Sequence, residues 1–257
     1  MIPRIISTRP FISLATVIAV GICVFFIHTK ETQIKDGKFK ALQFTERNAL
    51  PALTTLPTPI DYTAAFAGKW LYRKVNLEGE FLPDHEVYLE NRISGDIPKP
   101  NSKKPSGFHI MMPFLLNTGQ IVWVNRGWVK RDSINRQNIP EVPPVPGKQK
   151  ITGYISLGQK SIFEMPSEAP HIINGHVVAL NFYLHDDKKD LPNRNVYPFL
   201  ITQTGKGSDS LIRPEEGFYY TPSYAFDLRT WWFTLIIAVS FWFISGLVQM
   251  RGKPPRL

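Results

Sequence analysis

The chain has 257 residues, of which 43% are hydrophobic and 20% charged, and its formal net charge at pH 7 is +9. A chain of this length forms one large domain or two small ones, and its positive charge raises the question of a nucleic-acid partner. Five of the 30 basic residues lie in the two ends of the chain; removing them leaves 25 basic against 21 acidic residues, a net charge of +4. This ordinary balance excludes nucleic-acid binding as the explanation of the charge. The five terminal residues are Arg4, Arg9, Arg251, Lys253 and Arg256.

An uncharged apolar run covers the 17 residues 11–27. As a helix it would span about 25 Å, against a hydrocarbon core of roughly 30 Å, so we predict a transmembrane helix over residues 11–28. The alternative is a cleaved signal peptide, but the sequence HTKE that follows offers no small-x-small cleavage site. We therefore expect an uncleaved anchor behind a tail of residues 1–10. The chain's one cysteine, Cys23, lies inside this run, so we expect no disulfide and no thiolate–metal site beyond it.

Residues 30–50 contain one glycine and no proline, and their apolar side chains are spaced loosely like one face of a helix. We predict one helix beside the membrane, ended by a group of prolines that begins at Pro51. The apolar side chains are Phe39, Leu42, Phe44, Ala49 and Leu50.

Seven segments beyond Lys69 are rich in β-branched and aromatic residues and are separated by turn residues, which predicts short strands. The sequence NTG at residues 117–119 predicts a hairpin turn between two of them. Residues 96–106 predict a polar, exposed loop, and four prolines exclude a central strand from a second loop at residues 138–147. The spacing predicts one mainly antiparallel β domain, barrel- or sandwich-like, with a few helices. The predicted strands are 70–77, 85–91, 108–116, 121–129, 150–157, 176–184 and 196–202.

A second uncharged apolar run covers the 19 residues 230–248. As a helix it would span about 28 Å. It is apolar on every face and contains three tryptophans, which argues against a buried core helix. The fold class that we predict is therefore two transmembrane α-helices flanking one extramembrane domain at residues 29–229, followed by a basic tail at residues 249–257.

Both predicted tails are basic and carry no acid. Short basic segments that flank transmembrane helices stay in the cytoplasm, which predicts that both termini are cytoplasmic and that the domain lies across the membrane. Ten residues before the first run leave no room for a mitochondrial transit peptide. We expect a multi-pass protein of a bacterial inner membrane with a periplasmic domain.

The sequence offers little support for an enzyme, because it has no GxSxG, HExxH or strand-linked GxGxxG motif. The sequence GKGS at residues 205–208 looks like a phosphate loop, but Leu200 stands where that motif has its first glycine, so we predict a flexible loop. We interpret His171 and His176 as loop histidines and His185 as part of a turn. We predict no enzyme, no catalytic residue and no metal site.

The predicted strand at residues 121–129 is the most distinctive part of the chain. An arginine between apolar neighbours on one face, Arg126, is expected to pair with a carboxylate that fixes the sheet, or to lie at the rim of a site. Gly127 permits a β-bulge or a close backbone approach. One face carries Val122, Val124, Arg126 and Trp128, and the other carries Ile121, Trp123, Asn125 and Gly127.

Three blocks resemble the signature blocks of the Surfeit locus protein 1 family of cytochrome c oxidase assembly factors. They are YRKVNLEG at residues 72–79, Pro113-Phe114, and VNRGWV at residues 124–129. Their order, the two terminal apolar runs and the length agree with the family, so the resemblance covers nearly the whole chain. The family positions are Tyr72, Arg73, Val75, Gly79, Pro113, Asn125, Arg126, Gly127, Trp128, Tyr224, Ala225 and Trp231.

The resemblance implies an inner-membrane assembly factor for a haem–copper oxidase that assists haem a insertion into the large subunit, or maturation of that subunit. The implied partners are the lipid bilayer, the oxidase large subunit and the enzymes of haem a synthesis. Two other classes stay open. One is a membrane-anchored periplasmic binding or scaffold module unrelated to oxidase assembly. The other is a membrane-tethered enzyme, which would need carboxylates or histidines that converge in a pocket.

The chain departs from the family pattern beside both apolar runs. The family often has a Trp-Gln pair and an arginine after the first run, whereas residues 30–40 contain neither tryptophan nor arginine. Before the second run the family usually reads His-Leu-x-Tyr-Ala-x-Thr-Trp-Phe. Its histidine position is Thr221 here when the Tyr-Ala pair is aligned, and Tyr224 when the Thr-Trp pair is aligned. That histidine is the family's candidate haem ligand, so we expect either another His, Met, Cys or Tyr ligand or a scaffold without haem.

Overall fold

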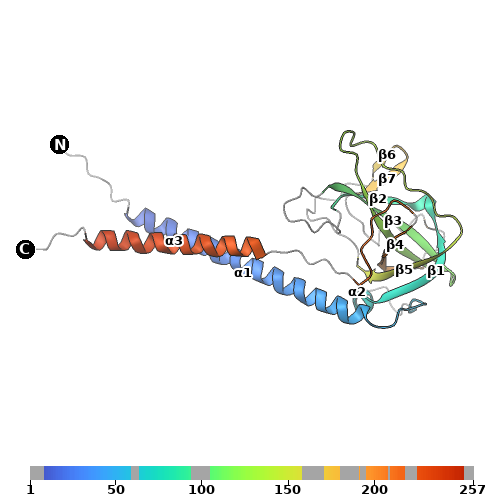
Figure 1. Ribbon diagram of the computed structural model, residues 1–257, viewed down its shortest axis with the longest axis horizontal. Helices are drawn as coiled ribbons and strands as arrows, with labels where there is room; N and C mark the ends of the chain where they lie inside the picture. The colour runs from blue at the N-terminus through green and yellow to red at the C-terminus, as the bar shows by residue number, and fades with distance from the viewer. Residues whose placement is uncertain are drawn as a thin grey trace, which may run out of the picture. The chain divides into compact units, whose positions relative to one another are not determined.

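The computed structural model of the chain forms two compact units, Met1–Ala41 with Thr221–Leu257 and Leu42–Tyr220 (Figure 1). The first unit is helical, and the second contains a β-sheet with short helices. The structure describes residues 9–58, 64–93, 105–157, 171–179, 191, 195–207, 209–217 and 225–251.

Helix α1 (Arg9–Asn48) is one continuous helix of 40 residues, so the first apolar run and the helix predicted beside it form a single element. Lysine, glutamate and glutamine are good helix formers, which lets the helix continue through the polar residues after the run. Within the described chain, Val17–Asn48 is the stretch that is long and apolar enough to cross a membrane. This agrees with the predicted anchor. The predicted boundaries of the tails and of the domain stay predictions.

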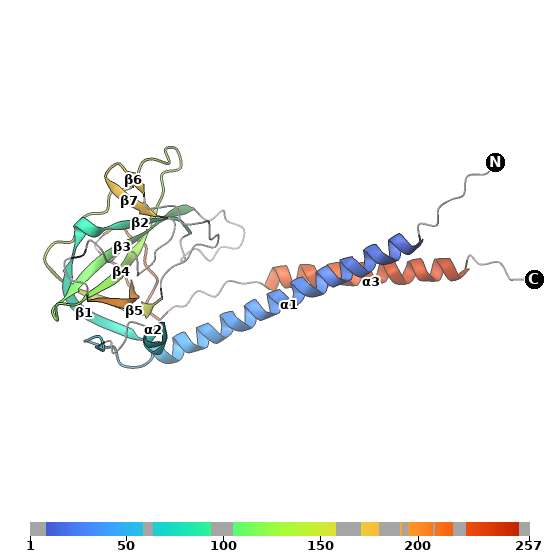
Figure 2. The same cartoon turned by 180° about the vertical axis from the view of Figure 1, so that it is seen from behind.

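Helix α3 (Ala225–Arg251) has 27 residues and contains a shorter apolar stretch, Leu228–Ile244, so the second transmembrane span stays a prediction. Figure 2 shows α3 beside α1 within the helical unit. The rings of Phe26 and Trp231 stack between the two helices, with centroids 4.4 Å apart and planes 7° apart. Cys23, one turn before this stack on α1, is buried.

The second unit contains the end of α1 and then a short helix, α2 (Ala64–Trp70), whose C-terminal carbonyl groups accept hydrogen bonds from a side chain of α1. Arg47 Nη1 donates a hydrogen bond to the carbonyl of Gly68 at 2.9 Å, which satisfies one of the carbonyls that a helix leaves open at its end. Tyr72 then has a φ of +67°, so the chain turns sharply there. Strand β1 (Lys74–Phe81) therefore begins later than predicted, because a helix end and a turn occupy the start of the predicted strand.

Each of the seven predicted strands overlaps a strand of the structure, and the predicted hairpin turn before residue 120 is present, with a φ of +81° at Gly119. Strand β6 was not predicted, because its three residues are too short for a periodic pattern. The end of the predicted strand 176–184 and most of the predicted loop 96–106 lie outside the described residues. The elements after β1 are η1 (Pro83–His85), β2 (Val87–Ile93), β3 (Ser106–Leu116), β4 (Ile121–Lys130), β5 (Lys148–Ser156), β6 (His171–Ile173), β7 (His176–Ala179) and β8 (Val196–Gln203).

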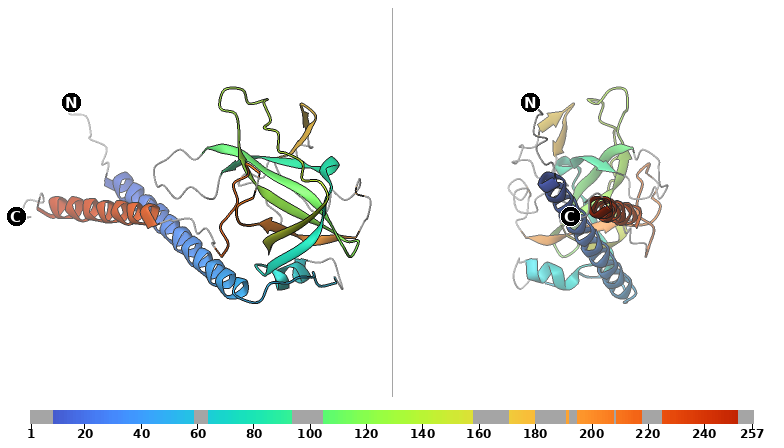
Figure 3. Two further views of the ribbon diagram at one scale, coloured as in Figure 1. Left: turned by 45° about the vertical axis from the view of Figure 1, so that its right-hand side comes forward. Right: turned by 90° about the vertical axis from the view of Figure 1, so that its left-hand side faces the viewer.

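The sheet has the strand order β1-β5-β8-β4-β3-β2-β7-β6, and a further pairing of β1 with β3 closes its first five strands into a barrel (Figure 3). Strands β2, β7 and β6 extend the sheet outward from β3. The pairs are mainly antiparallel, as predicted, but β4–β8 and β2–β7 are parallel. The long connections before β7 and β8 allow parallel pairing, which a short hairpin cannot provide.

The barrel interior is filled by apolar side chains from all five of its strands, including Val75, Phe114 and Ile201. A separate cluster contains Ile139 and Val142 from the proline-rich loop together with Phe108 and Ile110 of β3. That loop contains no strand, as predicted, yet it covers part of the sheet.

Candidate functional site

Strand β4 carries a bulge at the centre of the distinctive segment. Ile110 of β3 is paired with Gly127, whereas the next residue of β3, Met111, is paired with Asn125. Arg126 is therefore an extra residue on β4 that has no opposite partner, the defining feature of a β-bulge. The bulge predicted from Gly127 is confirmed.

The bulge changes which side chains share a face. Before it, Val122 and Val124 pack in the barrel core as predicted. After it, Trp128 is paired with His109, so it lies on the outer face, because opposite residues of an antiparallel pair share a face. The predicted grouping of Trp128 with Arg126 is wrong, since one inserted residue reverses the alternation.

Gly127 also permits the close backbone approach that its position suggested. Its φ is +138°, and a Cβ built there would lie 2.9 Å from the carbonyl oxygen of Ile212 and 3.0 Å from Cγ of Arg213. Trp128 and Ile212 exchange two N–H···O hydrogen bonds of 2.8 Å, which hold the segment after β8 against the bulge. The chain at Ile212 is therefore a third hydrogen-bonded neighbour of β4, beside β3 and β8.

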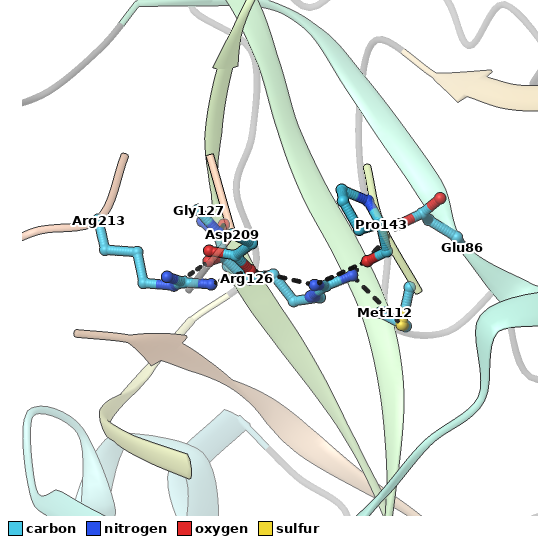
Figure 4. Close-up of polar contacts among 8 residues, drawn as sticks. Glu86, Met112, Arg126, Gly127, Pro143, Asp209 and Arg213 are labelled. Carbon is cyan, nitrogen blue, oxygen red and sulfur yellow. Dashed lines mark hydrogen bonds and ion pairs between the residues drawn. The ribbon is translucent and has the colours of Figure 1, made fainter. Parts of the chain in front are cut away.

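Arg126 points into the barrel core and is 1% exposed. Its Nη2 donates to Oδ2 of Asp209 at 3.2 Å and lies 3.5 Å from the carbonyl oxygen of Pro143 (Figure 4). On its other side, Nη1 lies 3.8 Å from Oε1 of Glu86. The guanidinium carbon stands 5.2 Å from the ring centroid of Phe81, a cation–π contact. Of the two readings of the sequence, the structural arginine–carboxylate pair is the one that this geometry supports.

A second arginine completes the cluster. Arg213 is 8% exposed, its Nε donates to the backbone carbonyl of Arg126 at 2.6 Å, and its Nη2 pairs with Oδ2 of Asp209 at 2.5 Å. One carboxylate oxygen is therefore shared by two guanidinium groups. Sequence reasoning missed Asp209, Arg213 and Glu86, because they lie between 40 and 87 residues from Arg126 and no motif marks them.

Burial and charge oppose each other in this cluster. Burial lowers the pKa of Arg126, whereas the nearby carboxylates raise it, and an arginine remains protonated at neutral pH. Burial acts to raise the pKa of Asp209, but the hydrogen bond and charge of Arg213, together with the charge of Arg126, hold it below its usual value. Burial raises the pKa of Glu86, although Arg126 opposes the shift. Asp209 is thus the main counter-charge.

A chain of hydrogen bonds fixes the bulge from the outer face. The backbone N–H of Gly127 donates to Oδ1 of Asn125 at 3.1 Å, and Nδ2 of Asn125 donates to Nδ1 of His109 at 2.7 Å. Burial, with the charge of Arg92, lowers the pKa of His109 to about 4. The imidazole is therefore neutral at pH 7, accepts at Nδ1 and carries its proton on Nε2.

The first two sequence blocks meet where β1 and β3 close the barrel, and not at Arg126. Gly79 is paired with Leu116, and a Cβ on it would lie 2.8 Å from Cε1 of Phe114. The carbonyl of Pro113 accepts a hydrogen bond of 3.0 Å from the N–H of Leu82. These positions are consistent with a role in closing the barrel.

The remaining positions singled out from the sequence lie elsewhere. Arg73 Nη2 donates to the carbonyl of Pro51 at 3.0 Å, and Tyr72 packs edge-on against Phe44 at 5.5 Å. Trp231 belongs to the helical unit. Ala225 is the first residue of α3, whereas Tyr224 and Thr221 lie outside the described residues.

The described residues offer no group of three or more His, Cys, Asp or Glu that could hold a metal ion. The predicted loop histidines are in fact in strands, since His171 belongs to β6 and His176 to β7. A haem iron needs a His, Met, Cys or Tyr ligand. Among the described residues of the two long helices, His28 is the one histidine. Its side chain is exposed, and it lies at the end of the first apolar run. Such a ligand fits haem chemistry, although it is not at the family's usual position.

Comparison with known proteins matches most of this chain to one family. The SURF1 family model matches residues 28–216. The chain is 28% identical over 124 residues to the cytochrome oxidase assembly protein SHY1 of Saccharomyces cerevisiae, a match covering 48% of this chain and 29% of the yeast protein. It is 26% identical over 139 residues to SURF1-like proteins of Rickettsia bellii and Rickettsia conorii, covering 49% of this chain and 53% of each relative. The matches thus span about half or less of these relatives.

Proposed function

The chain belongs to the SURF1 family, and from this membership we propose that it is a membrane-anchored factor in the assembly of a cytochrome oxidase. The observation that carries the proposal is the extent of the family match, which includes the bulge of β4, the β1–β3 seam and the segment around Arg213. The name of the yeast relative, a cytochrome oxidase assembly protein, supports the same role.

The proposed mode of action is binding and not catalysis. The charge of Arg126 is directed to Asp209 and Glu86, and its side chain is 1% exposed. His109 is neutral and hydrogen-bonded within the sheet. These groups stabilise a rigid barrel that presents its surface to a partner.

The finer part of the proposal is assistance in haem a insertion into the oxidase large subunit. Haem a would supply the redox and ligand chemistry of the mature oxidase, and this chain would hold the cofactor during transfer. His28 is our candidate ligand, because it is an exposed imidazole beside the apolar surface of α1. The finer location is a bacterial inner membrane, with both termini in the cytoplasm, a periplasmic barrel and α3 as the second span.

The proposal is tested in a strain that lacks the chromosomal copy and carries either the wild-type chain or Arg126→Met. Membranes from the deletion strain should lose haem a absorption in a reduced-minus-oxidised spectrum, and the wild-type chain should restore it. Arg126→Met should restore less, with immunoblots recording how much protein accumulates. The matched control is Arg136→Ala, because Arg136 is exposed on a loop.

Intact haem a absorption and full oxidase activity in the deletion strain would contradict the proposal and favour a binding module unrelated to the oxidase. The haem step has its own test, purification of the full chain from cells that make haem a. Bound haem should be present in the wild type and reduced in His28→Ala. Preparations of the wild type and of His28→Ala that both lack haem would contradict haem binding and would support a scaffold role.

A further inference from the structure

An open cleft of about 380 Å³ lies at the end of the barrel that Arg126 closes. Its walls come from β5, from the end of β8 and from the residues that follow β8. The size lies within the range of small-molecule sites, about 300–1,000 Å³. Its apolar wall consists of Phe81, Val145 and Ile151, and its neutral polar wall consists of Gln149, Thr152, Gln203 and Thr204.

The charges that line this cleft are unequal. Four cationic side chains, Arg126, Lys150, Lys206 and Arg213, face two carboxylates, Asp209 and Glu216. Counting the ion-pair partners just outside the lining, Lys74, Glu78 and Glu86, gives five cations against four carboxylates. The excess is therefore one positive charge even on the widest count.

The excess belongs to Lys206. Each of the other four cations is within 4 Å of a carboxylate, whereas Lys206 is exposed and has no ion-pair partner in the part of the chain that the structure describes. Lys150 adds a second available charge, because its pair with Glu78 at 3.3 Å is exposed on both sides, 68% and 60%. Exposed pairs of this kind stabilise by only about 0–1 kcal/mol, so a ligand can compete for the lysine.

Two glycines hold Lys206 at the cleft. Gly205 has a φ of +80°, and its N–H donates to the carbonyl of Pro214 at 3.1 Å. Gly207 lies so close to the guanidinium of Arg213 that a Cβ there would overlap Nη1. The loop is therefore anchored on the buried arginine cluster, where Asp209 Oδ1 and Arg213 Nη1 are buried without a hydrogen-bond partner among the described residues.

We propose that this cleft binds a small organic anion with two or more carboxylates, through the side chains of Lys206 and Lys150. Lys150 belongs to β5 and Lys206 follows β8, so we expect a molecule with two separated negative charges to contact both lysines. The apolar wall favours a carbon skeleton, which inorganic phosphate lacks. The inference does not depend on a role in oxidase assembly.

The test is isothermal titration of the full chain in detergent with succinate and, separately, with inorganic phosphate, at matched ionic strength. Succinate should bind saturably, and Lys206→Gln and Lys150→Gln should each weaken its binding about tenfold, the loss expected when a charge-assisted hydrogen bond is removed. Lys130→Gln is the matched control, because Lys130 is an exposed lysine outside the cleft. All three positions are exposed, so folding should be preserved and is checked by circular dichroism.

Three results would overturn the inference. The first is no saturable heat with succinate at concentrations up to about 10 mM, which is tenfold weaker than a Kd of about 1 mM. The second is succinate binding that both Lys206→Gln and Lys150→Gln leave unchanged. The third is binding of phosphate without binding of succinate. The last result would assign the cleft to inorganic anions. Succinate binding that is weakened about tenfold in each of the two lysine variants and unchanged in the control would support the inference.

Discussion

The bulge of β4 and the helix pair α1–α3 are stabilised in different ways. At the bulge, Arg126 alone contacts a carboxylate, a backbone carbonyl and an aromatic ring, and its neighbours are fixed by hydrogen bonds on both faces. In the helical unit, one ring stack joins Phe26 to Trp231, and long apolar side chains such as Phe233 are exposed. Among the described residues, the bulge is specified by several polar partners, whereas the contact described between the two helices is an aromatic stack.

The contrast has a physical reason. A buried charge is costly unless several groups compensate it, so every partner of Arg126 has to be in place together. Apolar helices in a bilayer gain nothing from hiding apolar surface, because lipid is equally apolar, and they depend on local packing. Substitutions at the bulge should therefore cost much more than substitutions between the helices.

The largest effect is expected from Arg126→Ala. It leaves the half-buried carboxylate of Glu86 without its arginine and opens space beside Phe81, so we expect a loss of about 3 kcal/mol in the free energy of unfolding. Urea denaturation followed by tryptophan fluorescence measures it. Arg136→Ala, on an exposed loop, should stay within about 0.5 kcal/mol of the wild type. Equal losses of stability in the two variants would contradict the conclusion that the buried charge cluster at the bulge stabilises the fold.

The second prediction concerns pH and His109. Burial lowers the pKa of the folded imidazole to about 4, from 6.5 for the free group. The unfolded chain therefore binds the proton first as the pH falls, so the stability contributed by neutral His109 is complete above pH 6.5 and is lost between 6.5 and 4. The total loss is about 3 kcal/mol.

The measurement is the free energy of unfolding against pH for the wild type and for His109→Gln. The raised pKa of Glu86 acts with the opposite sign, because the folded protein holds that proton longer, and the difference between the two curves cancels it. A difference curve that is flat from pH 7 to 4 would show that His109 is not the group that links the bulge to pH.

The sequence was informative where the pattern is local. Alternation and turn residues predicted the strands. Gly127 indicated a bulge or a close backbone approach, and the structure has both, the second with Ile212. The alternation failed beyond the bulge, because a single extra residue transferred Trp128 to the other face. A strict alternation of period two cannot predict where such an extra residue is inserted.

The partners of the site were beyond reach of the sequence for a different reason. Asp209 and Arg213 reach Arg126 only because β8 pairs parallel to β4 and the chain then turns back beside the bulge. Parallel pairing depends on a long connection and leaves no local signature. Arg126 itself was identified as an arginine that needs a carboxylate; which carboxylate it meets is a property of the topology.

A third prediction compares a glycine from each region. Gly127→Ala places a methyl group at a φ of +138° and within 2.9 Å of the carbonyl oxygen of Ile212, so we expect a loss of about 2 kcal/mol. Gly37→Ala, in α1 with nothing within 4 Å, should instead stabilise the helix by about 0.5–1 kcal/mol. Thermal unfolding by circular dichroism measures both. A shift of the same sign in both variants would contradict the assignment of Gly127 to a strained bulge.

The smallest effect is expected between the helices. A double-mutant cycle with Phe26→Ala and Trp231→Ala should give a coupling energy of about 0.5–1.5 kcal/mol, the range of an aromatic pair. Unfolding in mixed detergent micelles with increasing dodecyl sulfate is a suitable readout. The matched control pairs Phe26→Ala with Phe233→Ala, whose ring is 65% exposed, and should show no coupling. Coupling in the first cycle alone shows that α3 packs on α1 through this stack, which is the condition for α3 to act as a second span beside the anchor. Equal coupling in both cycles would mean that the helices associate without a defined face, and the contrast with the bulge would then become sharper.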